Sequence, residues 1–153
     1  MPLEAAEFLT LPGDGDCLRR HVTAQRAYYD WVVEGSARSP LIEAAFDRLE
    51  DLWPPDPGTP VLNWGDARIG NVVYDGFEPA AVLDWEMAAL APPRGRPRLE
   101  YYTLYAALRH AIVMRRVAYR QVHFGEVAVP ADPDTLILHH GSLRAMVQGS
   151  YWD

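Results

Sequence analysis

The sequence is most distinctive in what it lacks, beginning with lysine. All fourteen basic residues are arginine, which excludes a lysine that could anchor a phosphate group. Cys17 is the single cysteine, so an internal disulfide is excluded and a reducing cytosol is favoured. The N-terminal segment lacks a basic region and a long apolar run, and we expect neither a signal peptide nor a membrane anchor. These features predict a cytoplasmic protein with no membrane partner.

The sequence also has fewer basic than acidic residues. Fourteen arginines face 21 acidic residues, and the formal net charge is −7. Nucleic acids and anionic membranes require a basic face, so we expect no nucleic-acid partner. A length of 153 residues predicts one domain, residues 1–153, with enough chain to bury a core.

Clusters of proline and glycine divide the chain into segments whose periodicity predicts helices and three short strands. Ser39 is expected to cap a helix that begins at Pro40 and ends before Pro54. The other predicted helices span residues 18–34 and 99–122, with a last one from about 132 to 148. The predicted strands span residues 61–64, 72–74 and 80–83. The expected fold is therefore α+β, with helices around a small β-hairpin.

Residues 61–86 contain the candidate site. Asp66, Asn71 and Asp84 follow one another at intervals of five and thirteen residues, bracketed by the predicted strands. A carboxylate at a strand end can accept or orient the proton of an attacking hydroxyl. Amide and carboxylate oxygens suit a hard cation such as Mg²⁺. Kinase-type phosphotransferases hold a catalytic carboxylate and two magnesium ligands at this spacing.

The motif resembles the core of the aminoglycoside phosphotransferase family: His-Gly-Asp, four residues, Asn, then Asp-Trp or Asp-Phe and Glu. Here Trp64 takes the place of the His, and an indole can fill the same space. The resemblance implies Asp66 as catalytic base, with Asn71 and Asp84 as ligands of Mg²⁺ and ATP. By position, Arg68 is expected to clamp or steer the transferred phosphate, and a plain surface role is the alternative. The implied reaction moves the γ-phosphate of ATP to a hydroxyl of a small molecule.

The resemblance implies a mostly helical, kinase-like C-terminal lobe whose small β-hairpin carries the catalytic loop. Residues 1–60 contain no glycine-rich loop, so we expect the N-terminal ATP lobe to be absent. A separate chain that supplies this lobe would complete the site. Related proteins continue after the motif into a Gly-Asp-Pro-like turn and further helices. We therefore expect an internal deletion near residues 92–98.

Several residues outside the ligand set receive structural interpretations. Gly65 and Gly70 are expected to serve the backbone of the loop, and Glu86 is expected to be structural or to support the neighbouring ligand residues. Four arginines on the predicted helix 99–122 are expected to be solvated or ion-paired rather than to form a ligand site. They are Arg109, Arg115, Arg116 and Arg120.

Two other functions stay open at this point. The chain could be a non-catalytic remnant or binding module that keeps the lobe and at most a weak Mg²⁺–nucleotide site. The missing lysine and glycine-rich loop favour this alternative for the isolated chain. A metal-dependent hydrolase is the weaker alternative, because no His or third carboxylate completes a water-activating site.

Overall fold

The computed structural model describes residues 3–92 and 99–152, which form two compact units. Met1–Ala24 and Asp56–Pro93 form the site unit, and Gln25–Pro55 and Arg94–Asp153 form the helical unit. Most of the regular structure is helical and the rest forms small antiparallel sheets, which confirms the predicted α+β class. The prediction of a single domain stays a prediction. The deletion expected near residues 92–98 falls on a stretch of which residues 93–98 lie outside the described residues.

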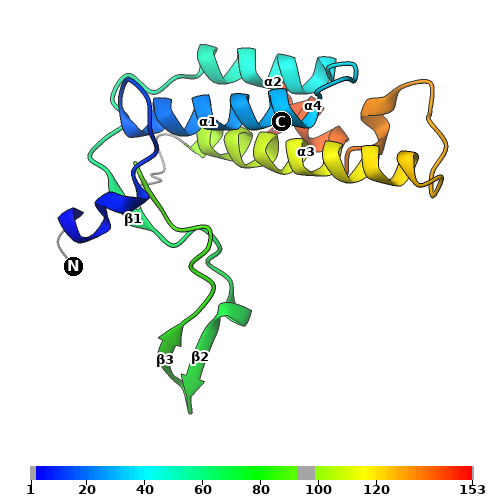
Figure 1. Ribbon diagram of the computed structural model, residues 1–153. Coiled ribbons are helices and arrows are strands. Elements are labelled where there is room, and N and C mark those ends of the chain that lie inside the picture. Colours follow the sequence, from blue (N-terminus) through cyan, green and yellow to red (C-terminus); the bar gives the residue numbers. More distant parts are fainter. Residues whose placement is uncertain (1–2, 93–98, 153) are drawn as a thin grey trace. The chain divides into compact units, whose positions relative to one another are not determined.

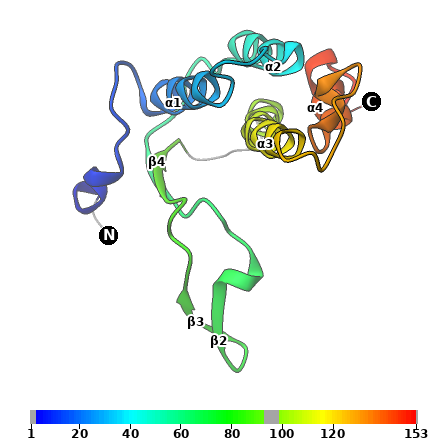
Figure 2. The same ribbon diagram turned by 45° about the vertical axis from the view of Figure 1, so that its right-hand side comes forward.

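The helical unit is built around three helices that contact one another pairwise: α2 (Pro40–Asp51), α3 (Leu99–His123) and α4 (His140–Gln148). Figure 2 views α2 and α3 nearly end-on. The C-terminal part of α1 (Cys17–Val32) also belongs to this unit. Apolar side chains at helical spacing fill the interior, and those with no exposed surface include Ile42, Ala45, Leu49, Leu108, Ile112 and Ile137.

Helix α2 begins where the sequence predicts. The Ser39 hydroxyl oxygen accepts a hydrogen bond from the Ile42 amide at 3.1 Å, and Pro40 occupies the first turn. This cap satisfies one of the amide groups that have no partner inside the helix. The Ser39 amide also donates to the Tyr29 hydroxyl at 2.6 Å. The cap therefore fixes the start of α2 against α1.

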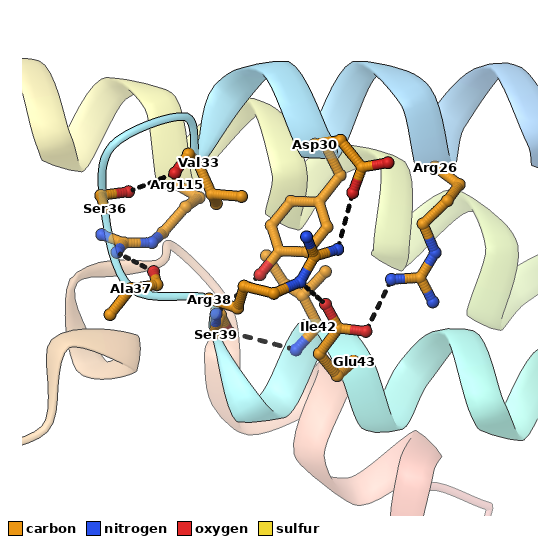
Figure 3. A network of polar contacts seen from close by, with 11 residues as sticks. Arg26, Asp30, Val33, Ser36, Ala37, Arg38, Ser39, Ile42, Glu43 and Arg115 are labelled. Atoms are coloured by element: carbon orange, nitrogen blue, oxygen red, sulfur yellow. Dashed lines mark hydrogen bonds and ion pairs between the residues drawn. The ribbon is translucent and has the colours of Figure 1, made fainter.

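An ion-pair network joins the end of α1 to the first turn of α2 (Figure 3). Arg38 contacts Asp30 at 2.7 Å and forms a second pair with Glu43. Arg26 contacts the other carboxylate oxygen of Glu43 at 2.6 Å. Glu43 thus lies between two guanidinium groups. Partial burial acts to raise the pKa of Glu43, but the two arginines outweigh it and hold this pKa below its usual range.

The last predicted helix is in fact two segments. A 3₁₀ helix, η4 (Pro133–Leu136), is followed by α4, which begins only at His140. His139 precedes α4 with a φ of 64°, a left-handed conformation that a right-handed helix does not contain. Ile137 is fully buried between the two segments. A continuous helix from residue 132 is therefore wrong, because the chain turns to bury Ile137.

Arg115 does not have the solvated or ion-paired role expected of it. Its side chain is buried and donates to the Ala37 carbonyl oxygen at 3.1 Å. Leu108 and Ile112 precede it on α3 by seven and three residues, so all three lie on the buried face of this helix. Arg115 is buried, although arginine is usually exposed, because it lies on the apolar face of α3.

The site unit contains two small antiparallel sheets. Strands β2 (Val72–Asp75) and β3 (Glu78–Val82) form a hairpin that turns at Gly76, seen in Figure 1. Strands β1 (Val61–Asn63) and β4 (Ala89–Ala91) form the other sheet, and a 3₁₀ helix, η1 (Leu3–Leu9), contacts both of its strands. Along the described chain, we find no helix whose length and apolarity would let it cross a membrane.

Three of the four strands were expected from the sequence. β1 and β3 each end one residue earlier than predicted, and β2 runs one residue further. β4 was not predicted, because three residues of alanine and leucine carry little strand signal. Its pairing with β1 matters for the site, because it places the two segments that connect the sheets next to each other.

Candidate functional site

The candidate site lies on the two segments that connect the sheets. The first segment, residues 64–71, follows β1 and ends in the 3₁₀ turn η2 (Ile69–Asn71). The second, residues 83–88, leads from β3 to β4. The Leu83 amide donates to the Asn71 carbonyl oxygen at 2.8 Å and so links the segments. The structure thereby brings together all four residues that the sequence singled out.

Asn71 lies at the centre of this group and is 8% exposed. Its side-chain Nδ2 donates to the Asp66 carboxylate at 3.0 Å and to the Asp66 carbonyl oxygen at 3.2 Å. The same nitrogen lies 3.4 Å from Oδ2 of Asp84. A buried amide is held in one orientation by such bonds. Asn71 therefore positions both carboxylates.

Arg68 lies on the solvent side of the two carboxylates. Its Nε is 3.0 Å from Oδ2 of Asp66, and its Nη2 is 3.7 Å from Oδ2 of Asp84. The Arg68 side chain is 64% exposed, compared with 37% for Asp66 and 31% for Asp84. One guanidinium faces two carboxylates, so the cluster keeps one net negative charge.

Asp84 has a left-handed backbone with a φ of 58°, which is unfavourable for a residue other than glycine. The Trp64 indole N–H holds this turn, donating to the carbonyl oxygens of Leu83 at 2.9 Å and Asp84 at 3.0 Å. The sequence placed Asp84 at a strand end, whereas β3 ends at Val82. It indicated that an indole could fill the space of the usual imidazole, but it did not reveal these two hydrogen bonds.

Gly65 allows the two segments to approach closely. Its φ is 93°, and a Cβ built there would lie 2.1 Å from the Met87 carbonyl oxygen. The expected backbone role of Gly65 therefore agrees with the geometry. Gly70 differs, because a Cβ there would meet nothing within 4 Å. The sequence could not separate these two glycines, since the contact with Met87 arises only from the fold.

The donor set of the cluster consists of oxygen atoms. Asp66 and Asp84 contribute carboxylates, and Asn71 carries an amide oxygen, although the atom that it turns towards the two carboxylates is Nδ2. Within residues 3–92 and 99–152, no group of three or more His, Cys, Asp or Glu side chains is placed to hold a metal ion. Two carboxylates and one amide are the donors that remain. They suit a hard cation that completes its coordination with water and phosphate oxygens.

A separate cavity of about 290 Å³ opens in the site unit beside β4. Polar side chains of α1 line part of it, including Cys17, Arg20 and His21. The imidazole Nε2 of His21 lies 3.0 Å from the Leu90 carbonyl oxygen, which ties α1 to β4. Burial raises the pKa of the Cys17 thiol, and the nearby Asp16 charge acts in the same direction. Cys17 is therefore poorly suited to act as a nucleophile.

Comparison with protein families agrees with the motif. A family model described as "Phosphotransferase enzyme family" matches residues 5–94, more than half of the chain. The match includes both segments of the candidate site and ends before α3. It confirms the resemblance that rests on Asp66, Asn71 and Asp84. The expectation that only a C-terminal lobe is present stays a prediction.

Proposed function

We propose that this chain, which belongs to the phosphotransferase enzyme family, takes part in transferring the γ-phosphate of ATP to a hydroxyl of a small molecule. One observation carries the proposal. Asp66 and Asn71 lie on the first segment and Asp84 on the second, and the three meet through the buried amide of Asn71. Phosphoryl transfer depends mainly on positioning and charge neutralisation, and this cluster supplies groups for both.

Asn71 and Asp84 are the residues that would hold Mg²⁺. The Asn71 Nδ2 bonds to Asp66, which leaves the amide oxygen Oδ1 as the atom suited to an ion. Asp84 adds a carboxylate, whose Oδ2 lies 3.4 Å from Nδ2 of Asn71. Mg²⁺ commonly takes one or two protein oxygens together with water and phosphate, so this donor set fits. When bound, the ion would neutralise charge on the phosphates of ATP.

Asp66 is proposed to orient the acceptor hydroxyl and take its proton. Its carboxylate is 37% exposed, so a substrate can reach it, and Asn71 fixes its position through the bond at 3.0 Å. A base must lie within hydrogen-bond reach of the proton that it removes. Arg68 lies beside this carboxylate, and its planar guanidinium matches the oxygens of a phosphate. We assign it to steering the transferred group.

A second candidate function rests on composition. These 153 residues contain no lysine, so any basic side chain among them that anchors the ATP phosphates would be an arginine. Without a partner chain, the same cluster would serve a non-catalytic nucleotide-binding module. A partner chain carrying the ATP lobe would reconcile the two functions.

The first test is thermal unfolding with and without Mg²⁺–ATP. Ligand at ten times its Kd should stabilise the protein by about 1.4 kcal/mol. Asp84→Asn should remove this shift, and asparagine tolerates the left-handed backbone at this position. Asp75→Asn, the same change at the exposed hairpin turn, is the control that should keep it. A wild-type protein that shows no Mg²⁺-dependent shift would contradict the proposal.

Phosphate transfer separates the two candidates. With a partner lobe present, an enzyme should transfer phosphate to a hydroxyl acceptor and lose this activity in Asp66→Asn. If the chain is a binding module, the wild type and Asp66→Asn should both show the Mg²⁺–ATP shift in thermal unfolding, and neither should transfer phosphate. The two outcomes differ in the reaction alone, because Asp66→Asn keeps the size and shape of the side chain.

A further inference from the structure

The number of guanidinium groups available to each carboxylate differs between the candidate site and the ion-pair network of the helical unit. In the helical unit, Glu43 contacts two guanidinium groups, those of Arg26 and Arg38. In the candidate site, Asp66 and Asp84 share the guanidinium of Arg68. Two carboxylates brought together repel each other unless a cation lies between them. Arg68 supplies part of that compensation.

The contacts of Arg68 are uneven. Its Nε reaches Asp66 at hydrogen-bond distance, 3.0 Å, but its Nη2 is 3.7 Å from Asp84. The side chain is 64% exposed, so water screens both pairs and the arm can leave without opening a core. The contact with Asp84, the carboxylate assigned to the ion, is therefore the weaker of the two.

We infer that Arg68 is a built-in counter-cation, which occupies the carboxylate pair before a divalent ion binds and is displaced when the ion arrives. The inference rests on the proposed function, because it takes Asp84 as a ligand of the ion. Two positive groups that approach the same carboxylate repel each other, so the ion and the guanidinium compete. Displacement leaves the guanidinium next to Asp66, where a phosphate would be transferred. Arg68 thus compensates the carboxylates before the ion binds and faces the transferred phosphate after it has bound.

Competition predicts that Arg68 weakens ion binding. Removing the guanidinium should tighten binding by about three- to tenfold, the scale expected for losing one or two exposed ion pairs. A residue that only stiffened the loop would have the opposite effect, since its loss would loosen the ligands. The sign of the change therefore separates the two roles.

The experiment is a titration with Mn²⁺, which takes oxygen ligands as Mg²⁺ does and whose free form is measured by electron paramagnetic resonance. We would compare the wild type with Arg68→Gln. Arg20→Gln removes one positive charge from the same unit, at a guanidinium that donates to the Gly15 carbonyl oxygen. Asp84→Asn removes the proposed ligand. Melting curves of all four proteins establish that each is folded.

Tighter binding in Arg68→Gln, with Arg20→Gln within twofold of the wild type and Asp84→Asn impaired, supports the inference. Equal or weaker binding in Arg68→Gln overturns it but leaves the metal site intact if Asp84→Asn still abolishes binding. Equal tightening in Arg20→Gln and Arg68→Gln also overturns it, since the effect would then come from the general field. If neither the wild type nor any of the variants binds Mn²⁺, both this inference and the proposed metal site fail.

Discussion

The two units of this chain are organised by different physical effects. The helical unit buries apolar side chains such as Ile42, Leu108 and Ile112 completely, and its helices contact one another pairwise. The site unit has strands of three to five residues, whose side chains are mostly exposed in β2 and β3 and mostly half-buried in β1 and β4. At its candidate site the buried side chain is polar, that of Asn71. The site unit also buries apolar side chains, such as Leu18 and Val22, but its candidate site is arranged by hydrogen bonds and close backbone contacts.

This difference between the units implies that a substitution affects different properties in each. A two-stranded sheet is at best marginally stable alone, so we do not expect β2 and β3 to stabilise the site unit by themselves. Asp84 keeps a strained backbone because the Trp64 indole and the neighbouring segment hold it. Such strain is commonly tolerated at functional sites. A substitution should therefore act on stability in the helical unit and on geometry in the site unit.

The largest expected effect comes from the core of the helical unit. Ile112→Ala removes a fully buried side chain and should lower the free energy of unfolding by about 2–5 kcal/mol. Ile69→Ala makes the same change at a side chain that is 80% exposed and should alter it by less than about 0.5 kcal/mol. Urea denaturation of both variants measures the contrast. Similar losses in the two would show that burial does not distinguish the units.

A smaller effect is expected at the glycines of the site. Gly65→Ala has to adopt a φ of 93° and place a methyl group against the Met87 carbonyl oxygen. We expect a loss of about 2–3 kcal/mol, from left-handed strain and overpacking. Mn²⁺ binding should weaken at the same time, because the two segments would move apart.

Gly70→Ala is the matched control, since its added Cβ meets nothing within 4 Å. It should leave Mn²⁺ affinity within about twofold of the wild type and change stability by less than about 1 kcal/mol. Thermal unfolding and Mn²⁺ titration of the pair provide both readouts. If Gly65→Ala kept wild-type affinity, close approach of the segments would not be what organises the site.

The sequence predicted most of the helical unit because its signals are local. Ser39 and Pro40 mark the start of α2, and the regular apolar spacing marks α2 and α3. The errors arose where tertiary contacts decide. The turn at His139 serves to bury Ile137, and the position of Arg115 on the apolar face depends on how α3 packs. No local pattern reports either feature.

The site residues could be predicted because their spacing is itself the signal. Asp66, Asn71 and Asp84 were selected before any geometry was known, and the structure brings them together. The geometry around them was not predictable. Strand β4, which places the second segment beside the first, is too short to recognise, and the bonds of the Trp64 indole require that placement. The roles of these residues remain proposals until the variants are measured.

The smallest expected effect is the pH-dependent stability that the ion pairs of Glu43 give to the helical unit. Glu43, between Arg26 and Arg38, has a pKa held below its usual range although partial burial opposes this. A lowered pKa adds stability that is present above the unfolded-state pKa of about 4.3 and is lost as the pH falls through the folded-state value. We expect Glu43→Gln to be about 1 kcal/mol less stable than the wild type at pH 7, since solvent screens these half-exposed pairs.

The difference between Glu43→Gln and the wild type should shrink towards zero as the pH falls well below 4, because the protonated wild type also loses its ion pairs. Urea denaturation across this pH range measures it. Glu34→Gln, at an exposed position of the same unit, should stay within about 0.5 kcal/mol of the wild type throughout. A constant deficit in Glu43→Gln at every pH would indicate lost packing instead of lost charge. A deficit confined to neutral pH would show that the ion pairs of Glu43 stabilise the fold.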